Sequence, residues 1–334
     1  MRERRYYPFS CFLRAAFGCK VHKVTIHAGF TCPNRDGRVG VGGCIYCVNA
    51  SFSHPAKGPM KPIREQVAVG TRFMRERYGA EKFIAYFQAF SNTYADVSTL
   101  KARYDEALSV DKDIVGLSIG TRPDCVPDEV LDLVQSYTER YHVWLEYGIQ
   151  SVHDRTLRII NRGHSLATFE DAIRRTKGRG IRICAHVILG LPGETWDDMM
   201  QTAEVVCGLG VDGIKIHHLY VAKDTPLAER HARGEVPTFT VEEYVPLAAD
   251  FLERISPDIA VQRLVGDTHG GLLVAPIWPK SKPEVFAAIE RELARRDSCQ
   301  GARCQHVEVA SAPRPATVSA ATNGTTARHE SACV

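Results

Sequence analysis

The regular alternation of short apolar segments with longer helical segments limits most strongly what this chain can fold into. Segments rich in β-branched residues predict strands at residues 24–28, 83–90, 114–119, 143–149, 181–189 and 213–220. Apolar residues spaced three or four positions apart predict helices at 63–78, 97–108, 129–141, 166–179 and 196–209. Strand–helix units with short connections imply parallel strands and right-handed crossovers. The sequence therefore predicts an α/β fold, either an open doubly wound sheet or a barrel.

The chain after the sixth predicted strand is expected to form an extension and a tail. Thr240 and Glu243 stand at capping-box spacing and open a helix, and residues 283–296 form a last amphipathic helix. Beyond about residue 305 the chain is rich in Ala, Ser, Thr and Pro without an apolar period, so burial cannot offset its ordering entropy. We expect an N-terminal segment (1–22), a core (23–235), a C-terminal α/β extension (236–304) and a disordered tail (305–334).

Length and composition indicate a globular protein with a sizeable core. The chain has 334 residues, of which 44% are hydrophobic. It has no apolar run of about 18 residues and no apolar leader, so we expect a cytoplasmic protein without a membrane partner. A formal charge of +3 does not decide for or against a nucleic-acid partner. Eleven scattered cysteines argue against a disulfide framework and for a reducing compartment.

Three of the cysteines lie in one loop after the first predicted strand. Cys32, Cys44 and Cys47 belong to the run C-P-N-R-D-G-R-V-G-V-G-G-C-I-Y-C, whose glycines suit a tight loop. A [4Fe-4S] cluster needs one ligand per iron, so three cysteines leave one iron open to another ligand. A structural zinc site is the competing interpretation, because zinc prefers four protein ligands and His27 and His54 are the nearest histidines. No second Cys-x-x-Cys pair follows at zinc-ribbon spacing.

Three further loops are predicted at the carboxyl ends of strands, where ligands gather in both candidate folds. Residues 120–124 follow the third strand, residues 148–151 the fourth and residues 190–194 the fifth. Together with the cysteine loop they are expected to meet at one rim of the sheet. The sequence therefore predicts the functional site at that rim.

In combination these motifs resemble the radical S-adenosylmethionine (SAM) superfamily. The resemblance rests on the Cys32-x11-Cys44-x2-Cys47 loop and on E-Y-G-I-Q-S at 146–151, N-R-G-H at 161–164 and G-L-P-G-E at 190–194. The wide cysteine spacing is typical of the branch that includes the elongator catalytic subunit. Within it, the chain is similar to YhcC/YtqA-type proteins over roughly residues 6–301, through V-H-K-V at 21–24, A-G-F-T-C-P-N-R-D-G at 28–37, Y-F-Q-A-F at 86–90, G-T-R-P-D-C at 120–125 and Q-G at 300–301.

The resemblance implies a partial (β/α)6 TIM-like barrel, with a [4Fe-4S] cluster held at its mouth by the three cysteines. In this superfamily SAM chelates the open iron and is cleaved to a 5′-deoxyadenosyl radical, which takes hydrogen from the substrate. Gln150 and Arg162 match polar positions that contact SAM in related enzymes. His186 stands where related enzymes hold the ribose, and Gly190 and Gly193 let the backbone approach the adenine. Each of these residues also has a purely structural interpretation.

The second predicted strand departs from the pattern of many relatives. Their Gly-Gly-Glu stretch, which binds the SAM amino group, is replaced here by residues 87–92, where Gln88 or Ser91 can accept the same hydrogen bond. The chain also has no room for an acetyltransferase domain, so acetyl-CoA chemistry is not implied.

The resemblance further implies a substrate, because elongator-like and YtqA-type relatives act on the wobble uridine of transfer RNA. We expect modification of the C5 substituent, for example cutting a carboxymethylaminomethyl group back to an aminomethyl group. Phe87, Phe90, Tyr94 and Arg122 offer planes on which an unstacked base can rest, or they pack in the core. Two alternatives stay open: radical chemistry on a protein or metabolite, and a zinc-stabilised nucleic-acid-binding module without catalysis.

An electron donor such as flavodoxin or ferredoxin is a further partner that the resemblance implies. No catalytic residue follows from the sequence. Tyr147, Tyr220, Cys125 and Lys223 are placed near the expected rim, where each can serve a late proton or hydrogen transfer or a structural role. The oligomeric state is not predicted.

Overall fold

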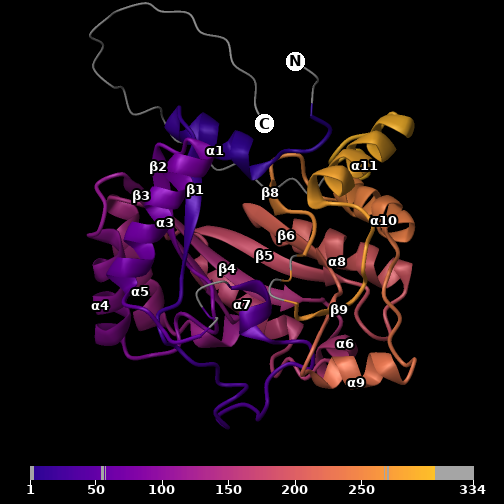
Figure 1. The fold of residues 1–334 in the computed structure, drawn as a ribbon, viewed down its shortest axis with the longest axis horizontal. Helices are drawn as coiled ribbons and strands as arrows, with labels where there is room; N and C mark the ends of the chain where they lie inside the picture. The colour runs from indigo at the N-terminus through magenta and orange to yellow at the C-terminus, as the bar shows by residue number, and fades with distance from the viewer. Residues whose placement is uncertain (1–3, 54–55, 57, 267, 269–270, 305–334) are drawn as a thin grey trace, which may run out of the picture.

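Seven parallel strands form one curled sheet in the computed structural model, which describes residues 4–53, 56, 58–266, 268 and 271–304 (Figure 1). The strands stand in the order β1-β2-β3-β4-β5-β6-β8 and make a half-barrel. Their bounds are β1 Val21–Ile26, β2 Lys82–Phe87, β3 Ile114–Thr121, β4 His142–Gln150, β5 Arg182–Leu189, β6 Gly213–His218 and β8 Ala260–Arg263. Two short strands, β7 (Val221–Ala222) and β9 (Leu273–Ala275), form a separate antiparallel pair.

Helices surround the curled sheet on its outer side (Figure 1). Each connection from β1 through β6 contains at least one helix, as neighbouring parallel strands require. The helices are α1 Phe9–Phe17, α2 Asn49–Phe52, α3 Ile63–Tyr78, α4 Val97–Leu108, α5 Asp128–Ser136, α6 Asp154–Ile159, α7 Leu166–Thr176, α8 Trp196–Gly208, α9 Pro226–Ala232, α10 Val241–Arg254 and α11 Lys282–Arg295, with 3₁₀ turns η2 Pro123–Cys125 and η3 Tyr137–Glu139.

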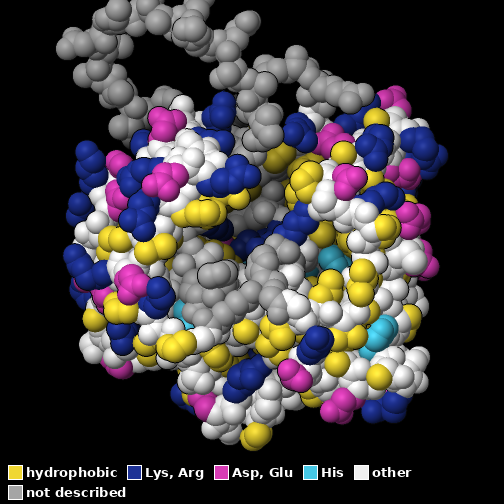
Figure 2. Space-filling view, in the orientation of Figure 1, with side chains coloured by type: hydrophobic (Ala, Val, Ile, Leu, Met, Phe, Trp, Pro, Cys, Tyr) yellow, Lys and Arg dark blue, Asp and Glu magenta, His cyan; other side chains and the backbone are white. Residues whose placement is uncertain are grey.

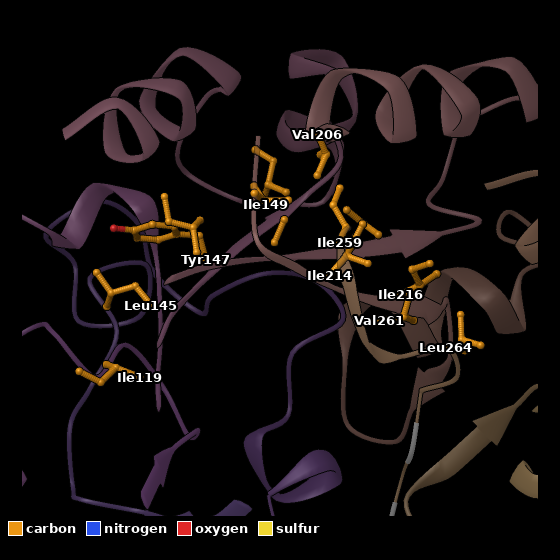
Figure 3. Close-up of a cluster of buried hydrophobic side chains, with 14 of the residues drawn as sticks. Ile119, Leu145, Tyr147, Ile149, Val206, Ile214, Ile216, Ile259, Val261 and Leu264 are labelled. Atoms are coloured by element: carbon orange, nitrogen blue, oxygen red, sulfur yellow. The ribbon is translucent and has the colours of Figure 1, made fainter. Parts of the chain in front are cut away.

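Apolar side chains on one face of the strands pack against this helical layer (Figure 3). On β4, Leu145, Tyr147 and Ile149 are fully buried in that cluster. Each such side chain contributes about 1.5–3 kcal/mol by leaving water. Because successive side chains of a strand point to opposite faces, Glu146 and Gln150 project into the barrel. The alternation along β4 thus decides which of its residues can reach the site.

All six predicted strands are present, and the structure selects the barrel over the open sheet. Their ends differ from the prediction by up to three residues, since β1 begins at Val21 and β2 ends at Phe87. Sequence patterns miss the seventh strand, β8, because it has only four residues and two of them are polar. It lies in the segment expected as the C-terminal extension, so that extension contributes to the main sheet.

The predicted helices are present as well. Thr240 and Glu243 form a reciprocal capping box at the start of α10, as their spacing predicts. The segment predicted as one helix over 129–141 is α5 followed by the 3₁₀ turn η3. The tighter turn brings the chain into β4 only two residues after η3 ends.

The N-terminal segment joins the two edge strands of the sheet. Pro8 forms a parallel bridge with Val261 of β8, and the N–H of Val261 donates to the carbonyl of Tyr7 at 2.8 Å. Further inside, Lys23 of β1 donates through Nζ to Oε1 of Gln262 at 2.6 Å. The gap between β1 and β8 is therefore bridged by backbone and by side chains.

The expected disordered tail, 305–334, lies outside the described residues. Among the helices that the structure describes, none has the length and apolar character needed to cross a membrane.

The packing of α1 against the sheet gives a test of the fold. Phe9 and Phe12 pack edge-on against the buried ring of Trp144, with centroid separations of 5.4 and 5.5 Å. Because Phe12 is only partly buried, Phe12→Ala is expected to lower the free energy of unfolding by about 2 kcal/mol, below the cost at a full core site. Urea denaturation measures this loss. The control is Phe73→Ala at a side chain that is 51% exposed, and equal losses in both variants would contradict the role of α1.

Candidate active site

A cavity lies at the carboxyl ends of the strands, where the sequence predicts the site. Residues from six strands, from the segments that follow them and from the cysteine loop line it together. They include Cys32, Cys44, Cys47, Gln88, Ser91, Arg122, Gln150, Arg162, His186, His217, Tyr220 and Arg263. Residues that are distant in the sequence therefore share one wall, as parallel strands with crossover helices require.

The cysteine loop is fixed to the turn that follows α6. The Asn34 side-chain amide donates to the carbonyl of Asn161 at 2.6 Å, and the Asn161 amide donates to the carbonyl of Gly43 at 2.8 Å. The backbone N–H of Ile45 donates to the carbonyl of Ile160 at 3.1 Å. This exchange of hydrogen bonds orders the loop without a metal.

The three cysteine thiols line the same cavity. Burial raises the pKa of Cys47, and the neighbouring Cys44 and Cys32 raise it further. Within the described residues, no group of three His, Cys, Asp or Glu side chains has the arrangement that would hold a metal ion. Of the two histidines weighed as zinc ligands, His54 lies outside the described residues. His27 stacks on Phe90 at 5.6 Å and does not line this cavity, but it lines a second cavity together with Cys44 and Cys47.

Arg162 lies beside the cysteine loop, against the end of β4. Its guanidinium donates to the carbonyl of Gly148 at 2.6 Å, and Nη1 lies 3.5 Å from Sγ of Cys44. A Cβ at Gly148 would lie 2.7 Å from Arg162 Nη2, so only glycine leaves space for this arrangement. Gln150 has a φ of +76°, which is rare outside glycine, and it ends β4 at an irregularity in the pairing with β5.

The two polar residues proposed for the SAM amino group both line the cavity. Gln88 donates from its side-chain amide to the carbonyl of Phe52 at 3.2 Å, so its side-chain oxygen stays available. Ser91 is 1% exposed, and its hydroxyl has no hydrogen-bond partner in the structure. A buried polar atom without a partner is costly unless a ligand supplies one.

Of the other three residues predicted to contact SAM, one lines the described cavity and two do not. His186 lines the cavity and donates through Nε2 to Oε2 of Glu146 at 2.8 Å. Gly190 and Gly193 do not belong to the lining that the described residues form. Both have positive φ, and a Cβ at Gly190 would lie 2.7 Å from the ring of Phe239, so close packing explains that glycine.

The four planes expected to receive a base differ in their access to the cavity. Phe90 and Arg122 line it, whereas Phe87 and Tyr94 do not. Arg122 is 2% exposed, because Asp124 binds its guanidinium through two 2.8 Å hydrogen bonds. Phe87 is fully buried and packs on a core tyrosine, as its structural interpretation predicts.

Of the four candidates for a late proton or hydrogen transfer, one lines the described cavity and three do not. Tyr220 lines the cavity, and its hydroxyl lies 3.2 Å from the hydroxyl of Ser51. Tyr147 points into the helical layer, where it bonds Thr176 at 2.7 Å. Lys223 is exposed and Cys125 is buried, and neither belongs to the described lining.

Sequence patterns missed a charged cluster in the cavity floor. Glu146 has 0% exposure, and both of its oxygens are bonded. Lys23 and Ser118 donate to Oε1, whereas Lys215 donates to Oε2, which His186 also contacts. These residues come from β1, β3, β4, β5 and β6. The available signal was a polar or charged residue at an inward position of several apolar strands, which is unusual unless the interior is polar.

The charges of this cluster are unequal, because two lysines face one carboxylate. Burial alone would raise the pKa of Glu146, but Lys215, Lys23 and His186 bring it well below its usual value. Burial lowers the pKa of Lys215 to about 7, although Glu146 opposes the change. Burial and Lys215 lower the pKa of His186 to about 4, so its ring is neutral at pH 7. Lys215 also donates to the hydroxyl of Tyr86 at 2.8 Å.

Comparison with known proteins identifies the class to which this site belongs. The Radical SAM superfamily matches residues 32–206, and the Radical_SAM C-terminal domain matches residues 211–295. The chain therefore belongs to the radical SAM superfamily. YtqA of Bacillus subtilis (strain 168) is 42% identical over 310 residues, which are 93% of this chain and 96% of YtqA.

More distant similarity extends to elongator-type proteins. A tRNA uridine(34) acetyltransferase of Methanocaldococcus infernus is 28% identical over 202 residues, which are 58% of this chain and 36% of that protein. The structure of the archaeal Methanocaldococcus infernus Elp3 with an N-terminal deletion has the same fold, with a TM-score of 0.66 and 17% identity. That match covers 85% of this chain and 64% of the other.

Membership makes this chain a radical SAM enzyme, and the cofactors of the family are a [4Fe-4S] cluster and SAM. The cavity fits them in three respects. Three thiols share one wall, Asn34 and Arg162 direct N–H groups to Cys44, and Ser91 offers a partnerless buried hydroxyl. When bound, the cofactors supply one-electron chemistry that removes a hydrogen atom from the substrate.

The lowered pKa of Lys215 predicts a pH-dependent stability. Between pH 7 and pH 10.5 the lysine is protonated in the unfolded chain but not in the folded one, so stability rises with pH by up to about 1.4 kcal/mol per unit. Lys215→Met is expected to show a smaller rise than the native chain when both are denatured by urea at pH 7, 8 and 9. Equal slopes would mean that Lys215 keeps its proton throughout this range.

Proposed function

We propose that this chain is a radical SAM enzyme that modifies the C5 substituent of the wobble uridine of transfer RNA. The observation that carries the proposal is the similarity of 202 residues, 58% of this chain, to a tRNA uridine(34) acetyltransferase. Because the similarity spans only 36% of that protein, acetyl transfer is not part of the proposal.

In this proposal Cys32, Cys44 and Cys47 hold the cluster, and Gln150 and Arg162 hold SAM. A guanidinium suits the methionyl carboxylate, because its planar N–H groups match two carboxylate oxygens. The position of Arg162 beside Cys44 supports this role, since SAM must meet the cluster there. The thiolates of the three cysteines would carry negative charge, and the same guanidinium supplies positive charge beside them.

The SAM amino group is assigned to Gln88 and Ser91. Each offers an oxygen that no described group uses, at the carboxyl end of β2. His186 is neutral and bonded to Glu146, so it can present its ring to a ribose without adding charge.

The reaction that fits best is the trimming of a carboxymethylaminomethyl group to an aminomethyl group: the N–CH2 carbon beside the carboxylate would lose one hydrogen atom through SAM, and one electron to the cluster with loss of a proton, and water would hydrolyse the resulting imine to the amine and glyoxylate. Phe90 and Tyr220 line the cavity and offer surfaces against which an unstacked uracil can rest. We further propose that the enzyme works in the cytoplasm with flavodoxin or ferredoxin as electron donor, because its thiols and cluster need a reducing compartment.

The cluster assignment is tested with cysteine variants. The triple substitution of Cys32, Cys44 and Cys47 by serine is expected to abolish retention of iron and sulfide after anaerobic reconstitution. The matched control is Cys299→Ser, at an exposed cysteine beyond α11. Iron retained in the triple variant would exclude these residues as ligands, and stoichiometric zinc in the native protein would favour the zinc module.

The substrate is tested in cells. Deleting the gene is expected to change the wobble-uridine nucleosides in transfer RNA hydrolysates, with build-up of the carboxymethylaminomethyl form measured by mass spectrometry. The native gene should restore the profile, whereas the triple cysteine variant should not. An unchanged profile would remove wobble uridine as the substrate.

A further inference from the structure

The cavity lining carries an excess of positive charge. Among the described residues that line it there are four arginines and one carboxylate, that of Glu146. Glu146 is already shared by two lysines of the cavity floor. Lys and Arg side chains are also visible around the hollow in the middle of the face shown in Figure 2. Such a cavity favours an anion, because bringing one in reduces the repulsion among the cations.

Three of these arginines have partners or a place near the cysteines. Arg122 is paired with Asp124, and Arg35 donates to the carbonyl of Cys47. Arg162 contacts Cys44 and the end of β4. The fourth, Arg263, has no hydrogen-bond or ion-pair partner within the part of the chain that the structure describes, although it lines the cavity. A guanidinium that lines a cavity without a partner among the described residues is available to bind an anionic ligand.

The surroundings of Arg263 suit an anion that enters the barrel. It ends β8, and its charge acts on Lys215, His186 and His217 of the neighbouring strands. Burial and then Arg263 bring the pKa of His217 well below its usual value, so that ring is neutral and can donate one N–H. The imidazoles of His186 and His217 lie 6.1 Å apart between centroids.

Arg263 and Arg162 stand at different places in the sheet. Arg162 adjoins the cysteine loop and β4, whereas Arg263 ends the edge strand β8, on the far side of β5 and β6 in the strand order. The guanidinium of Arg162 can thus bind the cofactors, and that of Arg263 can bind a second anion. A backbone phosphate is flanked by two nucleotides, whereas a carboxylate at the end of a slender substituent can reach the cavity floor.

We propose that Arg263, with His217, forms a subsite for the carboxylate at the end of the uridine C5 substituent. This inference rests on the proposed function and extends it to substrate selection: the enzyme accepts a wobble uridine that ends in a carboxylate and releases the product once that carboxylate is gone. A planar guanidinium holds a carboxylate through two parallel hydrogen bonds, which a neutral amide cannot replace.

The test compares two transfer RNAs that differ only at the wobble uridine. One carries the carboxymethylaminomethyl group and the other the aminomethyl group. The reconstituted native enzyme with SAM should bind the first about 10- to 100-fold more tightly at fixed salt, as a charge-assisted contact predicts. In Arg263→Gln this ratio should fall toward one, and Arg263→Lys should keep an intermediate ratio. The melting temperature of each variant reports on folding.

The matched control is Arg38→Gln, whose guanidinium lies over Tyr94 at 5.7 Å and does not belong to the described lining. It should weaken both transfer RNAs equally, if at all, and leave the ratio unchanged. A ratio unaffected by Arg263→Gln, in an enzyme that trims the substituent, would overturn the subsite but not the function. Arg162→Gln is the reference for loss of SAM binding. If Arg263→Gln loses SAM binding to the same extent, Arg263 binds the carboxylate of SAM, and the subsite is overturned. If the native enzyme trims no transfer RNA, both proposals fall.

Discussion

The buried carboxylate of Glu146 is the point through which the strands of this half-barrel are linked on their inner side. Its two oxygens take bonds from groups on β1, β3, β5 and β6, so strands that share no backbone pairing are held by one side chain. Removing one partner of such a buried group costs about 3–5 kcal/mol, because the remaining charges lose their compensation. The same cluster keeps the cavity floor polar directly below the positions assigned to the cofactors.

The cavity divides into two regions with different chemistry. On one side, a loop of three cysteines is fixed to the turn after α6, with Arg35 and Arg162 as neighbouring cations. On the other, β6 and β8 present histidines and an unpaired arginine. Cysteines and cations at different places in one cavity suit a reaction in which a hydrogen atom passes a short distance between two bound molecules. Gln150, whose backbone conformation is unusual for its residue type, also lines this cavity.

The fold was largely predictable from the sequence, and the site only in part. Strands β1 to β6 were predicted because their apolar runs are long, whereas β8 was missed because it is short and half polar. The cysteines, Gln88, Ser91, Gln150, Arg162 and His186 line the cavity, because they lie on parallel strands or in the connections that leave the carboxyl ends of those strands. Gly190, which the resemblance assigns to the adenine, does not belong to the described cavity lining, and a Cβ there would lie 2.7 Å from the ring of Phe239. The Glu146 cluster depends on contacts between four or more strands, which no local pattern encodes.

The bridging of β8 by the N-terminal segment fixes where the two ends of the described chain emerge. The backbone N–H of Gln300 donates to the carbonyl of Arg5, and its side chain accepts from Tyr7 and donates to Ile259 at the start of β8. These contacts lie at the amino ends of the strands, opposite the cavity. The described chain therefore begins and ends, at residues 4 and 304, on the side of the sheet away from the cavity. The same proximity makes the chain a suitable scaffold for circular permutation.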